Sequence, residues 1–327
     1  MQKERIALWD NTKFFLMILV AIGHLISLDT DGSHLYRGIY LFIWSFHMPL
    51  FIFISGLFHK NTNIKQKAVS YLSIYAVLKV LYLVIRMVTH QKLKFELFTE
   101  DGLPWFLFAL AVFVVLTYLL RDFDKKYVLA IVILLSLFSG YDKNIGDFLV
   151  LSRIIVFYPF YFAGTMVSRE KIESLAKRRS VKATAFALIS AWGLICLFLT
   201  DKIYYIRPLL SGRNPFNSTL AEHGFLFRAG TSILAAVIGL CFILIMPTFR
   251  LGKITVFGQR TLQVYFWHDL IVKFAFNMGA FALFEESGYL KIIWALLGIP
   301  LTFILSLDIF KYPVNWLLNG AKKQENK

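Results

Sequence analysis

Long apolar runs separated by short charged or polar stretches dominate this sequence. The runs fall near residues 14–28, 39–58, 69–88, 104–120, 127–141, 153–168, 183–200, 229–246, 262–284 and 289–310. A helix needs about 20 mostly apolar residues to cross the hydrocarbon core of a bilayer. The pattern therefore predicts an all-α protein, a polytopic membrane helix bundle with about ten transmembrane helices. We expect residues 1–327 to form a single integral-membrane domain.

The composition fits a membrane protein and excludes an ordinary soluble globule. Of the 327 residues, 58% are hydrophobic and only 17% are charged. A net charge of +15 would suggest nucleic-acid binding in a soluble protein, but in a membrane protein the basic residues mark the cytoplasmic side. The two cysteines both lie in apolar runs, which favours neither a disulfide framework nor a cysteine-based metal site. We expect membrane lipid around the protein, no nucleic-acid partner and no metal.

The distribution of basic residues predicts the orientation of the chain. If the N-terminus is cytoplasmic, the loops on that side carry about twice as many lysines and arginines as the outer loops. The positive-inside rule then predicts both termini in the cytoplasm and an even number of spans. The expected location is the cell (cytoplasmic) membrane, with multiple passes. The longest predicted outer loop, near 201–228, is either a lid that recognises an acceptor or a passive connector.

Two ionisable residues of the first apolar run lie at helical spacing. Lys13 and His24 are eleven residues apart, which places them on one stripe of a helix and about 16 Å apart along its axis. Lys13 would then lie at the cytoplasmic boundary and His24 near mid-membrane, where ionisable groups are costly and usually functional. The alternatives are that Lys13 is an anchoring residue and that His24 only bonds to a neighbouring helix.

The second run contains helix-distorting and small residues. His47 precedes Pro49 by two positions, and Ser55 and Gly56 follow. Proline frees backbone carbonyls in a spanning helix, and small residues allow another helix or a ligand to approach closely. This pattern predicts a distorted, tightly packed helix beside a cavity, or packing alone.

Three further polar residues are candidates for chemistry. His268 and Asp269 are neighbours in the ninth run and point about 100° apart, so we expect each to face a different partner. Asp269 either orients a histidine of another helix or pairs with Lys273, four residues later. Arg153 enters the membrane at the outer end of the sixth run, where it stabilises an anion or a developing oxyanion, or only marks the boundary.

Together these segments resemble the membrane-bound acyltransferase-3 family, and within it the fucose 4-O-acetylase-like branch of bacterial glycan O-acetyltransferases. The similarity covers nearly the whole chain. The segments that carry it are Asp10, Lys13 and His24; Phe51, Phe53, Ser55 and Gly56; Pro-Trp-Phe-Leu at 104–107; Arg153 with the run at 159–164; and Gly258 with Tyr-Phe-Trp-His at 265–268. The family often has arginine at the position of Lys13, which here keeps the charge but loses bidentate geometry.

The resemblance implies an enzyme, an O-acyltransferase that moves an acetyl group from cytoplasmic acetyl-CoA, as co-substrate, to a hydroxyl of an extracytoplasmic glycan or lipid-linked sugar. The basic residues predicted to hold the anionic CoA are Arg5, Lys13, Lys60 and Arg260, with Ser55 also at the donor site. His24 is the expected general base, because neutral imidazole has a suitable pKa. An acyl-histidine intermediate is the chemical alternative.

The remaining polar residues are assigned roles in the same mechanism. Arg153 is expected to position the acceptor or stabilise the oxyanion, while His47, His268 and Asp269 are expected to line the substrate tunnel. The competing hypotheses are a secondary transporter or flippase and a non-catalytic scaffold. The lack of half-to-half symmetry and the scarcity of mid-span carboxylates weigh against a transporter.

Overall fold

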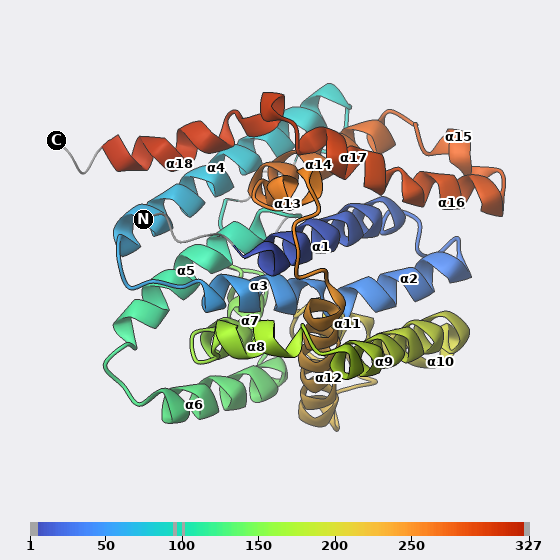
Figure 1. Ribbon diagram of the computed structural model, residues 1–327. Helices are drawn as coiled ribbons and strands as arrows, with labels where there is room; N and C mark the ends of the chain where they lie inside the picture. Colours follow the sequence, from blue (N-terminus) through green and yellow to red (C-terminus); the bar gives the residue numbers. More distant parts are fainter. Residues whose placement is uncertain (1–5, 94–96, 100–101, 324–327) are drawn as a thin grey trace.

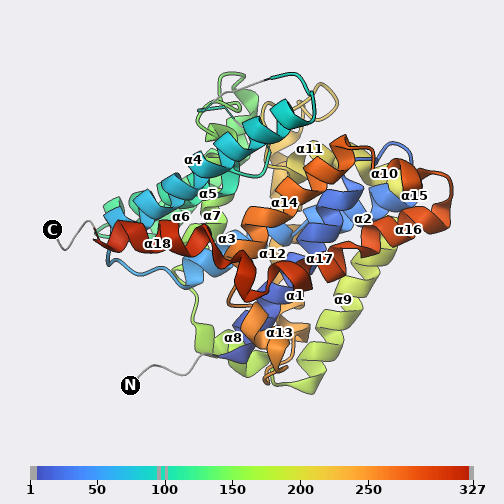
Figure 2. The ribbon, with the colours of Figure 1, turned by 90° about the horizontal axis from the view of Figure 1, so that it is seen from above.

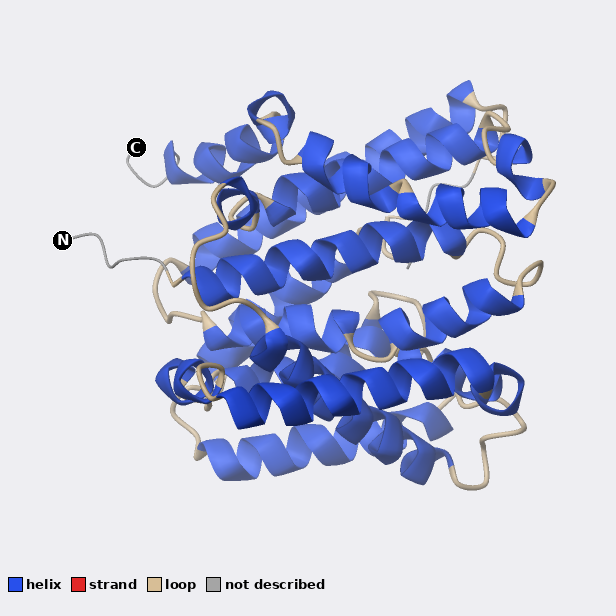
Figure 3. Cartoon of the chain, turned by 45° about the vertical axis from the view of Figure 1, so that its right-hand side comes forward, coloured by secondary structure: helices blue, strands red, loops and turns tan. Residues whose placement is uncertain are grey.

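The computed structural model describes residues 6–93, 97–99 and 102–323 of the chain. These residues form helices joined by loops (Figure 3), with one isolated bridge between Thr99 and Phe148.

The first half of the described chain is mostly helical. Its helices are α1 (Ala7–Ile26), α2 (His34–Trp44), α3 (His47–Leu57), α4 (Ile64–Val88), α5 (Trp105–Leu119), α6 (Lys125–Phe138), the 3₁₀ turn η1 (Ser139–Tyr141), α7 (Leu151–Gly164) and α8 (Arg169–Leu175).

The second half alternates long helices with short ones. They are α9 (Arg179–Phe198), α10 (Thr200–Ile203), η2 (Tyr204–Ile206), α11 (Arg207–Leu210), α12 (Gly224–Ile245), α13 (Lys253–Phe257), α14 (Thr261–Asn277), α15 (Ala282–Glu285), α16 (Gly288–Leu296), α17 (Gly298–Leu305), η3 (Asp308–Lys311) and α18 (Val314–Lys323).

The all-α, multi-pass prediction is confirmed, with a smaller number of candidate spans. In the described part of the chain six helical segments are long and apolar enough to cross a membrane, and α7 with α8, bent by 80°, makes a seventh if the pair is one span. The runs at 104–120 and 127–141 form helices of only 15 and 14 residues, which is short of the usual crossing length. Ten spans and cytoplasmic termini therefore stay predictions.

Helix α1 occupies the centre of the bundle. It packs between α2 and α3 on one side and α14 and α17 on the other (Figures 1 and 2). Two thirds of its apolar window is buried (67%), against 17% for the peripheral α9. Polar side chains on α1 therefore face protein and internal cavities, which is where ionisable groups at membrane depth are tolerated.

The second predicted span is broken and tightly packed, as its sequence predicts. The helix is interrupted at 45–46 between α2 and α3, and Nδ1 of His47 lies 2.8 Å from the carbonyl oxygen of Ile43, bridging the break. Further along, a Cβ on Gly56 would collide with the carbonyl oxygen of Tyr161 on α7. A glycine therefore brings the backbones of α3 and α7 together, and this packing fixes the wall of a cavity described below.

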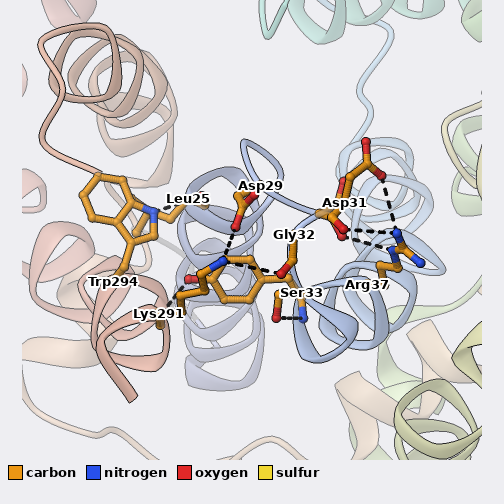
Figure 4. A network of polar contacts seen from close by, with 10 residues as sticks. Leu25, Asp29, Asp31, Gly32, Ser33, Arg37, Lys291 and Trp294 are labelled. Atoms are coloured by element: carbon orange, nitrogen blue, oxygen red, sulfur yellow. Dashed lines mark hydrogen bonds and ion pairs between the residues drawn. The ribbon is translucent and has the colours of Figure 1, made fainter. Parts of the chain in front are cut away.

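The end of α1 beyond His24 is fastened to α16. Nε1 of Trp294 donates to the carbonyl of Leu25 at 3.1 Å, and the ammonium of Lys291 lies 2.9 Å from Oδ2 of Asp29, as Figure 4 shows. Beside them the guanidinium of Arg37 donates to two carbonyls of the α1–α2 turn. This network fixes the C-terminal end of the helix that carries His24.

The other end of α1 is held by the segment before α14. Nδ2 of Asn11 donates to the carbonyls of Pro247 and Phe249 at 2.9 and 3.0 Å, and the hydroxyl of Thr255 donates to Oδ1 of Asn11 at 2.7 Å. Every polar atom of the buried amide is thus satisfied, which is required where water is excluded. With both ends anchored, the position of His24 along α1 is set.

Candidate active site

Two internal cavities meet at His24. The first, of about 190 Å³, contains Lys13 and Ser55 in a mostly apolar wall, and we call it the Lys13 cavity. The second, of about 230 Å³, contains Arg153 in a more polar wall, and we call it the Arg153 cavity. His24 lines both, and its side chain keeps 20% exposure although it lies deep in the bundle.

The two cavities extend toward opposite ends of the bundle. On α1 the Lys13 cavity is lined by residues that precede His24, whereas the Arg153 cavity is lined by Ser27 and Leu28, which follow it. On α14 the same division separates Thr261 from Lys273. A molecule in either cavity therefore reaches the same imidazole from a different side of the protein.

A buried carboxylate contacts the imidazole. Nδ1 of His24 lies 3.2 Å from Oδ1 of Asp269, which is 2% exposed. The other carboxylate oxygen lies 3.1 Å from the ammonium of Lys273 and accepts a hydrogen bond from the hydroxyl of Tyr82. A buried charge is tolerated only when it is paired and hydrogen-bonded, and Asp269 meets this condition with three partners from three helices.

Both contacts weighed for Asp269 from the sequence are therefore present together. The carboxylate pairs with Lys273, one helical turn away on α14, and it also faces the histidine of another helix. Because a carboxylate only accepts hydrogen bonds, the proton of a neutral His24 lies on Nδ1, facing Asp269, and Nε2 is left as the basic nitrogen.

His268 packs against His24 and does not line either cavity. Its ring is fully buried, with its centre 5.1 Å from that of His24. Nδ1 lies 2.9 and 3.0 Å from the carbonyl oxygens of Val264 and Tyr265, so this nitrogen carries the proton. Its Nε2 has no hydrogen-bond partner within the described ranges. His268 is absent from the walls of the two cavities, so its expected place in the lining of a substrate tunnel stays a prediction.

His47 and Arg153 both line the Arg153 cavity with His24. The ring of His47 packs edge-on against Trp44, with 4.9 Å between ring centres, and Trp44 in turn lies 5.8 Å from His24. Arg153, in the first turn of α7, stacks its guanidinium over the ring of Trp105 at 4.3 Å. This stacking holds the cation at the cavity wall.

The residues predicted to hold the acyl donor divide into two groups. Lys13 and Ser55 line the Lys13 cavity, and the ammonium of Lys13 lies 2.8 Å from Oδ1 of Asp10. Arg260 instead bonds to the carbonyl of Ser306 and to Asp308, at 2.8 and 3.2 Å, away from the cavity lining.

The other two predicted donor-binding residues are Lys60 and Arg5. Lys60 is exposed in the loop after α3 and does not line the Lys13 cavity. Arg5 lies outside the described residues. No group of three His, Cys, Asp or Glu side chains able to hold a metal ion is found in the ranges that the structure describes.

Several residues that line or support the site were not identified from the sequence. Tyr82 lies in the apolar run of α4, and Met48, which lines both cavities, belongs to no motif. Leu103, which also lines both cavities, carries one local signal, because it directly precedes the Pro-Trp-Phe-Leu segment. Their roles depend on which helices meet, which the spacing within one run does not encode.

The comparisons with known proteins agree with the resemblance in the sequence. A family model described as an acyltransferase domain matches residues 6–311. The chain belongs to the acyltransferase-3 family of membrane acyltransferases. The nodulation protein NolL of Sinorhizobium fredii is 25% identical over 293 residues, covering 79% of this chain and 75% of NolL. No solved structure matches.

Family membership defines the general activity of this acyltransferase. It is a multi-pass membrane enzyme, an O-acyltransferase that takes an acyl donor and an acceptor as substrates. Both cavities that meet at His24 are lined by residues of the segments that carry the resemblance, Lys13, Ser55 and Tyr265 in the first and Trp105 and Arg153 in the second.

Proposed function

We propose that this O-acyltransferase transfers an acetyl group from cytoplasmic acetyl-CoA to a hydroxyl of a glycan or lipid-linked sugar on the opposite side of the cell membrane. The observation that carries the proposal is that His24 lines both cavities, which extend toward opposite ends of α1. A donor and an acceptor held in separate cavities would meet at one base without either substrate crossing the bundle.

The Lys13 cavity suits the donor. Its wall is largely apolar, with the ammonium of Lys13 at one end and the imidazole of His24 at the other. The eleven-residue separation of these two side chains corresponds to about 16 Å along the helix. The flexible pantetheine arm fits such a passage, and the anionic head of CoA is attracted to the basic residues at the Lys13 end.

The Arg153 cavity suits a hydroxylated acceptor. Trp44 and Trp105 supply aromatic faces, while Ser27 and Arg153 supply hydrogen-bonding groups. A sugar presents both apolar ring faces and hydroxyl groups, so its chemistry matches this mixed wall. Arg153 either positions the acceptor or stabilises the oxyanion that forms on the acyl group.

His24 acts as general base in the proposed reaction. Its Nε2 removes the proton of the acceptor hydroxyl while that oxygen attacks the carbonyl carbon of the thioester. The carbon–sulfur bond then breaks, and the proton passes from His24 to the CoA sulfur, so the products are an acetyl ester and free CoA. Asp269 holds the imidazole through Nδ1 and stabilises the positive charge that His24 acquires. An acetyl-His24 intermediate is the alternative route.

The proposal is tested with purified protein in proteoliposomes that contain lipid-linked glycans extracted from the native membrane. Acetyl-CoA labelled in the acetyl group is added, and label is measured in the lipid and glycan fractions together with release of free CoA. Equal amounts of transferred label and free CoA are expected. Movement of intact glycolipid without consumption of acetyl-CoA would instead identify a transporter or flippase.

The acceptor is identified by mass spectrometry of surface glycans from cells with and without this protein. We expect one glycan to lose an acetyl-sized mass when the protein is removed. Identical glycan spectra would contradict a glycan acceptor.

A further inference from the structure

Among the residues that the structure describes, three form the boundary between the two cavities. His24, Met48 and Leu103 line both the Lys13 cavity and the Arg153 cavity. They come from α1, from the first turn of α3 and from the turn before α5. Two of the three are apolar, so the side chains of Met48 and Leu103 offer water no hydrogen bond at the boundary itself.

A hydrogen bond from helix α14 holds Leu103 at this boundary. The hydroxyl of Tyr265 donates to the carbonyl of Leu103, and Leu103 is 6% exposed. The preceding Gly102 has φ +70°, and a Cβ there would lie 2.7 Å from the ammonium of Lys273. Tyr265 and Lys273 flank Asp269 on the same helix, so one element holds both the carboxylate that contacts His24 and the turn that presents Leu103.

Met48 closes the boundary from the other side. It is half-buried at the start of α3, directly after His47, whose ring bridges the break between α2 and α3. Methionine is unbranched and flexible, so it fills an irregular gap and still yields to a substrate.

A base placed between two cavities activates any hydroxyl that reaches it, including that of water. Attack by water on the thioester forms a carbon–oxygen bond, breaks the carbon–sulfur bond and releases a free carboxylic acid with CoA. This hydrolysis would consume the donor whenever the acceptor is absent. The enzyme therefore needs a barrier to water beside His24.

We propose that Leu103 and Met48 form an apolar partition that keeps water away from the acyl thioester until an acceptor hydroxyl fills the Arg153 cavity. The partition sets the ratio of transfer to hydrolysis. The inference rests on the proposed acetyl-CoA-dependent function and adds the residues that determine selectivity against water.

The test measures acetyl-CoA hydrolysis by purified protein in proteoliposomes without acceptor. Leu103→Ala and Met48→Ala are each expected to raise the rate of CoA release at least about fivefold over the wild-type protein. Adding His24→Ala to Leu103→Ala is expected to remove the increase, because the leak uses the same base. Size-exclusion profiles and thermal melting verify that each variant is folded, and Met48→Ala serves if Leu103→Ala does not fold.

Leu244→Ala and Met246→Ala are matched controls. Leu244 is 6% exposed, like Leu103, Met246 is 9% exposed, and neither lines the Lys13 cavity or the Arg153 cavity. Hydrolysis by these variants is expected to stay at the wild-type rate. An equal increase in the control and partition variants, or no increase in the partition variants, overturns the inference. Absence of any acetyl transfer by the wild-type protein with native glycolipid is a separate result that contradicts the proposed function itself.

Discussion

Nδ1 of His24 on α1 lies 3.2 Å from Oδ1 of Asp269 on α14. Two residues far apart in the sequence therefore make contact at the centre of the bundle. Asp269 is buried and is held in turn by Lys273 and Tyr82. The arrangement fixes the imidazole in one orientation and directs Nε2 away from the carboxylate. This is the geometry that a general base requires before its substrate arrives.

Asp269→Asn is expected to lower kcat roughly 10- to 1,000-fold with little change in KM for acetyl-CoA, because the amide holds the imidazole less well and no longer stabilises its positive charge. Asp269→Glu should recover part of the loss. The measurement is steady-state transfer of labelled acetyl groups. Asp201→Asn, which removes a carboxylate paired with His34 and outside the lining of both cavities, is the control. A fall in kcat of the same size for both asparagine variants would show a general loss of structure instead.

Lys13→Gln is expected to raise KM for acetyl-CoA about five- to tenfold and to change kcat little, since Lys13 lines the end of its cavity remote from His24. Lys13→Arg keeps the positive charge and should stay within about twofold of the wild-type KM. The magnitude corresponds to the loss of one charge-assisted contact, about 1–1.5 kcal/mol. Initial rates over a range of acetyl-CoA concentrations test this, and equal KM values for Lys13→Gln and the wild-type protein would remove Lys13 from the donor site.

Gly56→Ala is expected to destabilise the protein by about 1–3 kcal/mol, because the added methyl group collides with the backbone of α7 at Tyr161 and the two helices must separate. Gly230→Ala, in α12, is the matched control, since a Cβ there meets nothing within 4 Å. This variant should be neutral or slightly stabilised. Thermal melting in detergent compares the two, and equal melting temperatures would contradict the close α3–α7 packing.

The periodic features of the sequence predict much of the site. The apolar runs predict the helices because burial in lipid requires continuous apolar surface, and each run overlaps at least one observed helix. The separation of Lys13 and His24 predicts a shared stripe, since helix geometry alone determines it. In the structure both side chains line the Lys13 cavity.

Features that depend on contacts between helices far apart in the sequence could not be predicted from the sequence. Tyr82 reaches Asp269 from α4, and Leu103 reaches the cavity boundary from a turn, yet each is an ordinary residue in its own segment. Arg260 has the charge expected of a CoA ligand, but the fold directs it to Asp308. Charge and local spacing identify candidates, whereas packing decides which of them meet.

Whether His24 is the general base is tested most directly by acetyl transfer with His24→Ala, measured with labelled acetyl-CoA and native glycolipid in proteoliposomes. His34→Ala, which removes a half-exposed histidine outside both cavities, controls for the loss of an imidazole, and thermal melting verifies folding of both variants. We predict that His24→Ala loses about 10²–10⁴-fold in kcat, the usual contribution of a general base, while His34→Ala retains transfer. Transfer by folded His24→Ala at close to the wild-type rate would show that His24 is not the general base.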